Sequence, residues 1–250
     1  MREETLTLQA MDKLGNHIRL MVFDADDTLW ALQNHFEDVE QEYCSLLASY
    51  GSREQISASL FATETANMED LGYGCKAFTI SLVENAVKVS RGKVEATVIA
   101  QIVKLGKTLL HLDAQPLDGV ERTLERLLQM PAADGQGRRF RLAVFTKGEL
   151  KDQENKLRRS GLARFFEHVR IVSDKTPQAY RDLCRDLHVQ PRETVMVGNS
   201  FKSDILPALD TGAYAVHIPF HTTWAHEMAE ECEHERLCRL SRFEELLNLV

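Results

Sequence analysis

Three carboxylates stand within four positions of the sequence, at Asp24, Asp26 and Asp27, directly after an apolar run. Like charges at this spacing repel one another, so at least one carboxyl group becomes harder to ionise. A bound divalent cation would offset the repulsion, and Mg²⁺ takes hard oxygen ligands of this kind. An acidic turn in solvent or a helix N-cap would use the same residue types, so the cluster alone leaves these alternatives open.

Polar side chains also follow three later apolar runs. They are the hydroxyl of Thr146, the ammonium of Lys175, and the amide and carboxylate of Asn199 and Asp204. If the runs are parallel strands, their carboxyl ends meet at one edge of a sheet, where open α/β sheets bind ligands. Carboxylates, a hydroxyl and an ammonium at one edge are the groups needed for phosphoryl transfer to a carboxylate nucleophile.

Five short apolar runs have the length and composition of buried strands. They span residues 17–23, 140–145, 169–172, 194–197 and 213–218. Helical patterns lie between most of them, so the chain predicts an α/β fold with a Rossmann-like parallel sheet and helices on both faces.

Capping signals mark several of these helices. Asp118 and Glu121 have the spacing of a capping box, and Thr176 with Pro177 predicts an N-cap followed by proline at the first helical position. Gly161 and Gly212 stand where helices are expected to end.

Residues 32–112 break the alternation, because apolar residues there recur at helical spacing. We expect an inserted helical cap domain at 32–112 and a core domain formed by residues 1–31 and 113–250. A glycine-rich bend at 71–76 lies within the insertion. It predicts either a specificity loop in which Tyr73 or Lys76 meets substrate, or an ordinary turn between helices.

The order of the polar residues resembles the haloacid dehalogenase-like (HAD) hydrolase superfamily. The first motif of that family, D-x-D-x-T/V, is matched by Asp24, Asp26 and Thr28. Its second is a Ser or Thr that ends a hydrophobic strand, as Thr146 does, and its third is a lysine often followed closely by proline, as Lys175 is. Its fourth, typically GDSxxSD, corresponds to GNSFKSD at 198–204. The resemblance covers about residues 18–220.

This resemblance implies roles for the site residues. Asp24 would be the nucleophile and form an aspartyl-phosphate, and Asp26 would protonate the leaving oxygen and then activate water. Thr146 and Lys175 would hold the phosphoryl oxygens, joined by backbone N–H groups near Lys147.

The resemblance also implies a Mg²⁺ site. Its ligands would be Asp24, the carbonyl of Asp26, Asn199 and Asp204, the last directly or through water. The family usually has Asp where this chain has Asn199, and an amide oxygen ligates without bringing charge. A weakened or inactive site is therefore an alternative.

We expect a Mg²⁺-dependent phosphatase that hydrolyses a small phosphorylated metabolite, with the helical insertion closing over the substrate. A phosphomutase or a haloacid dehalogenase of the same superfamily is an alternative, although a dehalogenase needs no second acid and this chain retains Asp26. A non-catalytic binding protein on the same scaffold is another, and Asn199 is the residue that favours it.

Composition limits the other classes of function. The 250 residues allow one or two domains, and 44% hydrophobic with 27% charged residues is typical of a globular protein. A net charge of −8 disfavours nucleic acid as the main partner, and the sequence holds no apolar run long enough to span a membrane. We expect a monomer or a homodimer.

The N-terminal residues carry charges of both signs without an apolar stretch, so we expect no secretory signal. Five scattered cysteines favour reduced thiols and a cytoplasmic location. The His- and Cys-containing segment 217–238 matches no common zinc pattern, and we expect it to be structural or at the surface.

Overall fold

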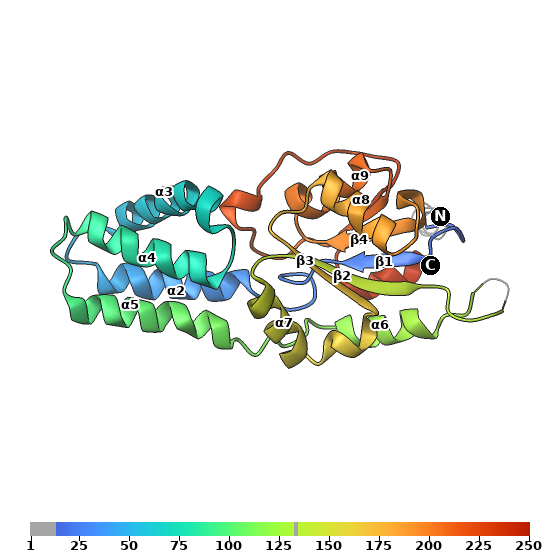
Figure 1. Cartoon of the computed structure of the whole chain (residues 1–250), viewed down its shortest axis with the longest axis horizontal. Helices are drawn as coiled ribbons and strands as arrows, with labels where there is room; N and C mark the ends of the chain where they lie inside the picture. The colour runs from blue at the N-terminus through green and yellow to red at the C-terminus, as the bar shows by residue number, and fades with distance from the viewer. Residues whose placement is uncertain (1–13, 133–134) are drawn as a thin grey trace, which may run out of the picture. The chain divides into compact units, whose positions relative to one another are not determined.

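A computed structural model of the chain describes residues 14–132 and 135–250 (Figure 1). They form two compact units. The sheet unit holds the described residues up to Ala31, together with those of Ala114–Lys147 and Leu157–Val250. The helical unit holds Leu32–Asp113 together with Gly148–Lys156.

The sheet unit is built on six parallel strands in the order β3-β2-β1-β4-β5-β6. The strands are β1 (Leu20–Phe23), β2 (Arg141–Lys147), β3 (His168–Val172), β4 (Thr194–Gly198), β5 (Tyr214–His217) and β6 (Leu237–Arg239). The chain leaves β1 to build β2 and β3 on one side, then crosses to β4 on the other. The sheet therefore reverses its order between β1 and β4, which is where open α/β sheets bind ligands.

Both faces of the sheet are apolar because both are covered by helices. The residues of β1 alternate between two cores, with Met21 and Phe23 in one and Leu20 and Val22 in the other. The first core includes residues of α6 (Val120–Gln129), and the second includes residues of α8 (Pro177–Asp186) and α9 (Leu206–Asp210) (Figure 1). All four residues of β1 are fully buried, as expected for a central parallel strand. The predicted Rossmann-like α/β fold is confirmed.

Local differences from the sequence analysis have physical causes. The first strand begins at Leu20 rather than at residue 17, and the three-residue strand β6 was not predicted, because Leu-Cys-Arg is too short to show an alternating pattern. The predicted capping box at Asp118 is wrong. The N-cap of α6 is Gly119 with φ +80°, a left-handed conformation that favours glycine, and its helix has no side-chain cap.

Other capping predictions are confirmed. The Thr176 hydroxyl accepts a hydrogen bond from the Ala179 N–H at 3.1 Å, and Pro177 is the first residue of α8. Gly161 and Gly212 follow α7 (Leu150–Arg159) and α9 with φ values of +71° and +87°. Short helical segments complete the fold: Leu109–His111, Leu162–Phe165, Pro191–Glu193, Phe201–Ile205, Ala225–Glu227 and Phe243–Asn248.

Four longer helices make up most of the helical unit: α2 (Gln33–Leu46), α3 (Arg53–Leu71), α4 (Cys75–Val89) and α5 (Ala96–Thr108) (Figure 1). They share one apolar core. The glycine-rich bend at 71–76 is a turn between α3 and α4, and Lys76 at its end forms an ion pair with Glu149. This contact, and a 3.4 Å hydrogen bond from Cys75 Sγ to Asp152, connect residues 148–156 to the helices of this unit, whereas the sequence pattern predicts these residues in the core domain.

No disulfide joins any of the five cysteines, all of which lie within the described residues. Within the described residues, no helix combines the length and the apolar character needed to cross a membrane.

The core of the helical unit contains a buried polar contact. Tyr43 and Asn85 are fully buried. The Tyr43 hydroxyl donates to the Leu82 carbonyl at 3.0 Å and accepts from Asn85 Nδ2 at 2.8 Å. A buried polar group is costly when it lacks a partner, so these bonds make the two side chains compatible with an apolar core.

We predict that Tyr43→Phe lowers the free energy of unfolding by about 1–2 kcal/mol, because it removes a buried hydroxyl and one acceptor of the Asn85 amide. Tyr50→Phe is the matched control, since its hydroxyl bonds the Lys93 carbonyl at an exposed position, and we expect a change below about 0.5 kcal/mol. Urea unfolding followed by circular dichroism measures both. Equal losses in the two variants would contradict the prediction.

Candidate active site

Asp24 lies directly beyond β1, and its N–H donates to the Val197 carbonyl of β4 at 2.9 Å. The chain then turns, because the N–H of Leu29 donates to the Ala25 carbonyl at 2.8 Å and Asp27 takes a left-handed conformation with φ +61°. The turn carries Thr28 back toward Asp24, where its hydroxyl donates to Asp24 Oδ2 at 3.0 Å. The carboxylate of Asp24 is thereby oriented at the carboxyl edge of the sheet.

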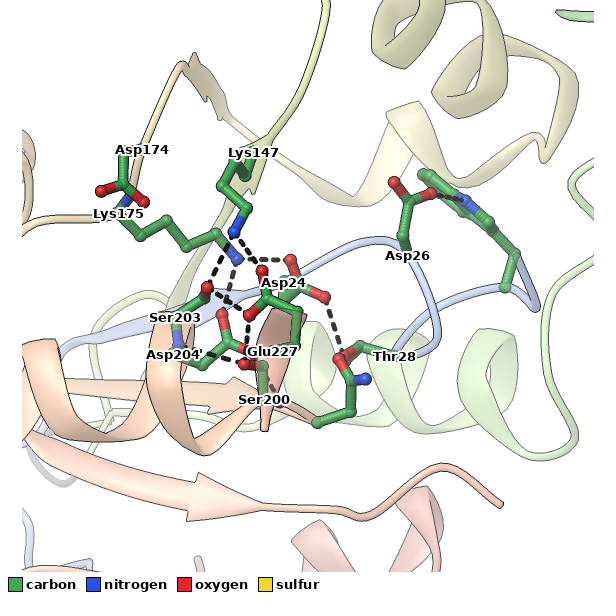
Figure 2. A network of polar contacts seen from close by, with 12 residues as sticks. Asp24, Asp26, Thr28, Lys147, Asp174, Lys175, Ser200, Ser203, Asp204 and Glu227 are labelled. Atoms are coloured by element: carbon green, nitrogen blue, oxygen red, sulfur yellow. Dashed lines mark hydrogen bonds and ion pairs between the residues drawn. The ribbon is translucent and has the colours of Figure 1, made fainter. Parts of the chain in front are cut away.

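Lys175 joins two carboxylates in the interior. Its Nζ forms ion pairs with Oδ1 of Asp24 and, at 2.6 Å, with Oδ1 of Asp204 (Figure 2). Only 2–3% of Lys175 and Asp204 and 7% of Asp24 is exposed. Charges at this depth are stable only when paired, so removing one member leaves an uncompensated buried charge. The sequence prediction that Asp24, Lys175 and Asp204 meet at one edge agrees with this geometry.

The surroundings of Asp24 and Lys175 shift the pKa values of both side chains. Burial raises the pKa of Asp24, Lys175 opposes the rise and Asp204 adds to it, and the pKa reaches about 7. Burial lowers the pKa of Lys175, but the carboxylates of Asp204 and Asp24 outweigh it and raise this pKa above its usual range. Two carboxylates thus share one ammonium, and a second positive charge beside Asp24 would favour its ionised form.

The loop after β4 fixes Asp204. The Ser200 N–H donates to Asp204 Oδ2 at 3.0 Å, and the Ser200 hydroxyl accepts from the Ser203 N–H at 3.0 Å at the start of the π-helix Phe201–Ile205. Gly198 makes this approach feasible, because a Cβ there would lie 2.2 Å from Asp204 Oδ2. In the same loop, Asn199 Oδ1 lies 3.2 Å from the Thr28 hydroxyl.

His217, at the end of β5, supports this loop from the neighbouring strand. Its Nε2 lies 3.0 Å from the Asn199 carbonyl oxygen. Burial lowers the pKa of His217, which favours the neutral ring. The side chain is 7% exposed, which fits the structural role expected for this part of segment 217–238.

The carboxylate of Asp26 is not part of the contact with Lys175. Its Oδ1 accepts a hydrogen bond from Trp30 Nε1 at 2.7 Å, and Figure 2 shows the Asp26 side chain apart from Asp24, Lys175 and Asp204. A tryptophan at this position is expected to pack in the core rather than to contact substrate. It is buried, but its indole N–H also holds Asp26, a contact that hydrophobic patterning does not reveal. The acid–base role of Asp26 stays a prediction.

Thr146 and Lys147 end β2, and Thr146 is buried. The Lys147 ammonium forms an ion pair with Glu227 and donates to Ser203 Oγ at 2.9 Å (Figure 2). The sequence predicts that the backbone N–H of Lys147 binds the substrate. The contacts above involve the side chain, so the role of the backbone N–H stays a prediction. The sequence around Glu227 predicts no part in the site, because this segment shows no periodicity and matches no motif.

The donors around Asp24 suit a hard cation. The Thr28 hydroxyl lies within hydrogen-bond distance of both Asp24 Oδ2 and Asn199 Oδ1. Because a hydroxyl has a single hydrogen, it can donate to only one of these two oxygens at a time. In the described parts of the chain, no three His, Cys, Asp or Glu side chains gather as a metal site. A Mg²⁺ site would therefore depend on the Asn199 amide and the Asp26 carbonyl beside Asp24. Oxygen donors of this kind fit Mg²⁺.

We predict a pH-dependent effect of Asp24→Asn on the stability of the metal-free protein. The folded-state pKa of Asp24, about 7, lies above the ordinary value of 3.8. Protonated Asp24 therefore stabilises the fold at low pH, and this contribution is lost as pH rises toward 7. Asn has no such loss, so the stability of the variant relative to wild type should rise by roughly 1–3 kcal/mol between about pH 5 and pH 8. Urea unfolding in a chelating buffer at several pH values measures the trend, and a reversed trend would contradict it.

Comparison with known proteins places these residues in a family. A family model for haloacid dehalogenase-like hydrolases matches residues 18–212, which include every site residue from Asp24 to Asp204. Two curated relatives are named glyceraldehyde 3-phosphate phosphatase. The protein of Methanopyrus kandleri is 26% identical over 209 residues, covering 80% of this chain and 84% of the relative. The protein of Methanothermobacter thermautotrophicus is 32% identical over 98 residues, which are 37% of this chain and 43% of the relative. The match therefore spans less than half of that relative.

Solved structures show the same likeness. A haloacid dehalogenase-like family hydrolase from Xanthomonas campestris superposes with a TM-score of 0.76 and 29% identity, covering 90% of this chain and 87% of that chain. A predicted phosphoglycolate phosphatase from Haemophilus somnus, 19% identical, covers 93% of this chain and 98% of that chain with a TM-score of 0.57, a likeness of fold alone. Since the family model spans more than half of the chain and includes its site, the protein belongs to the haloacid dehalogenase-like hydrolase family.

Proposed function

We propose that the protein is a Mg²⁺-dependent phosphatase that hydrolyses a small phosphorylated metabolite through an aspartyl-phosphate on Asp24. The observation that carries the proposal is the buried contact of Lys175 with Asp24 and Asp204 at the carboxyl edge of the sheet. A lysine there orients the carboxylate and offsets part of the negative charge that an incoming phosphate adds. The reversal of strand order between β1 and β4 puts the contact at the usual ligand position of the fold.

The relatives give the first substrate to test. Two relatives of this chain are named glyceraldehyde 3-phosphate phosphatase. We therefore propose a triose phosphate, or a phosphorylated metabolite of similar size, as the substrate class. Identities of 26% and 32% support the reaction type better than the identity of the substrate.

In the first step of the proposed reaction, an Asp24 carboxylate oxygen bonds to phosphorus as the bond to the leaving oxygen breaks, and Asp26 gives its proton to that oxygen. In the second, water attacks phosphorus, Asp26 takes the water proton, and the bond to Asp24 breaks to release phosphate. Asp26 has to turn from Trp30 to reach the leaving oxygen. Thr146, Lys175 and the backbone N–H of Lys147 hold the phosphoryl oxygens in both steps.

The residues that would hold Mg²⁺ are Asp24 through Oδ2, Asn199 through Oδ1, the carbonyl of Asp26, and Asp204 directly or through water. When bound, the ion supplies positive charge to the phosphoryl oxygens and keeps Asp24 ionised. The helical unit would act as the cap that excludes bulk water, an inference supported by the place of its larger part, Leu32–Asp113, between β1 and β2. Five cysteines that form no disulfide favour the cytoplasm.

We predict that the wild-type protein hydrolyses p-nitrophenyl phosphate and glyceraldehyde 3-phosphate with Mg²⁺ and loses activity in chelator. Asp24→Asn removes the nucleophile and should lower kcat by about 10³-fold or more. Asp27→Asn is the matched control, because it changes a neighbouring carboxylate outside the proposed site and Asn tolerates the same left-handed backbone. Its kcat should stay near that of the wild type. Phosphate release is measured directly.

Equal background rates for wild type and Asp24→Asn across a panel of phosphorylated metabolites would overturn the proposal in favour of a binding protein. Halide release from a haloacid without Mg²⁺ would replace it with dehalogenation. A requirement for a bisphosphate activator, with the phosphoryl group returned to the substrate, would indicate a mutase.

We predict that Asn199→Asp binds Mg²⁺ about tenfold more tightly, because a carboxylate adds charge to a ligand that is now neutral. Titration calorimetry without substrate measures the affinity. Ser241→Asp is a suitable control, since it adds one negative charge at an exposed position distant in sequence. Equal or weaker binding by Asn199→Asp would count against Asn199 as a metal ligand.

A further inference from the structure

Glu227 receives hydrogen bonds from three side chains of the candidate site. Its Oε1 pairs with the Lys147 ammonium, and its Oε2 accepts from Ser200 Oγ at 2.6 Å and from Ser203 Oγ (Figure 2). Only 14% of the Glu227 side chain and 12% of the Lys147 side chain is exposed. A carboxylate that satisfies three donors at this depth is costly to remove, because each donor then loses its partner.

The three donors are chain neighbours of the proposed catalytic and metal-binding residues. Lys147 directly follows Thr146, Ser200 directly follows Asn199, and Ser203 directly precedes Asp204. Glu227 thus connects the end of β2 to the loop after β4. Since the Ser200 N–H also bonds Asp204 Oδ2, the hydrogen bonds continue from Glu227 to Asp204 and Lys175.

Two hydrogen bonds fix the segment that carries Glu227 beside the loop 199–204. Lys202 Nζ donates to the His226 carbonyl at 2.7 Å, and the Glu227 N–H donates to the Trp224 carbonyl at 2.8 Å. Burial raises the pKa of Glu227, but Lys147 and the two serine hydroxyls outweigh it and lower the pKa to about 2. The side chain is therefore ionised at neutral pH. Glu227 lies beyond residues 18–212, the part of the chain that the family model matches.

We propose that Glu227 is a positioning residue of this active site, which fixes Lys147 and the loop 199–204 so that Thr146, Asn199 and Asp204 keep the geometry needed for phosphoryl transfer. This inference rests on the proposed function. Glutamine does not replace the carboxylate, because an amide has one acceptor oxygen and its NH₂ group cannot accept from the ammonium. Aspartate is one methylene shorter and cannot reach all three donors from the same backbone position.

The first readout needs neither metal nor substrate. The amides of Ser203, Asp204 and Ile205 are hydrogen-bonded to Ser200, so their hydrogen exchange reports whether the loop is fixed. We expect Glu227→Gln to raise exchange at these three amides by about tenfold or more, with exchange in β1 and β2 unchanged. Glu231→Gln is the control in the same segment, because its side chain is 58% exposed and pairs with Arg239 at 3.5 Å, and it should match the wild type.

The second readout separates positioning from substrate binding. On p-nitrophenyl phosphate, we expect Glu227→Gln to lower kcat by about 10- to 100-fold and to change KM by less than about threefold. Lys147→Met should produce a similar loss. The double variant should be no worse than the poorer single variant, because the two side chains act through one contact.

Wild-type exchange and wild-type kcat in Glu227→Gln would overturn the inference. Faster exchange throughout the sheet unit would also overturn it, since Glu227 would then only stabilise the fold. If Glu227→Gln does not fold, Ser203→Ala removes a single hydroxyl and should give a smaller change of the same kind, with exchange read at Asp204 and Ile205. A wild type without phosphatase activity would refute the proposed function alone, and the exchange readout would still test whether Glu227 fixes the loop.

Discussion

A single ammonium between two buried carboxylates is the interaction on which the site depends. Lys175 reaches Asp24 and Asp204 from the segment after β3, while those carboxylates follow β1 and β4. Three segments distant in sequence must therefore end at one place, or the buried charges would be unpaired. The parallel sheet satisfies this condition because all its strands point in one direction, so their carboxyl ends share an edge.

Backbone geometry decides which side chains the edge can hold. The left-handed turn at Asp27 returns Thr28 to Asp24, and Gly198 leaves room for the carboxylate of Asp204. Burial raises the pKa of Asp24, and the negative charge of Asp204 adds to the rise that Lys175 opposes. In the proposed mechanism a cation near Asp24 would keep this carboxylate ionised, and the neutral Asn199 would contribute less charge to binding that cation than an aspartate.

The segment after β5 adds a second ion pair to the first. Glu227 pairs with Lys147 and also accepts hydrogen bonds from Ser200 and Ser203 in the loop after β4. Asp204 of the same loop pairs with Lys175, so this loop connects the two ion pairs. Asp26 stands apart from both and is held by Trp30. The carboxylate proposed to attack phosphorus is thus held by Lys175, whereas Asp26, the proposed proton donor, would have to turn from Trp30.

The sequence alone is enough to predict the parallel α/β core, which is confirmed, and to propose Asp24, Thr28, Lys175, Asn199 and Asp204 as site residues. Each of them follows an apolar run, and the carboxyl ends of parallel strands share one edge. Local signals also predicted the cap at Thr176, yet they failed at Gly119 and at the three-residue strand β6, where a backbone conformation or a neighbouring strand decides. The hydrogen bond from Trp30 to Asp26, and the pairing of Glu227 with Lys147, 80 positions away, become visible only in the folded chain. A pairing of this kind leaves no periodic trace in the sequence, since it depends on how loops of different length meet after the sheet has formed.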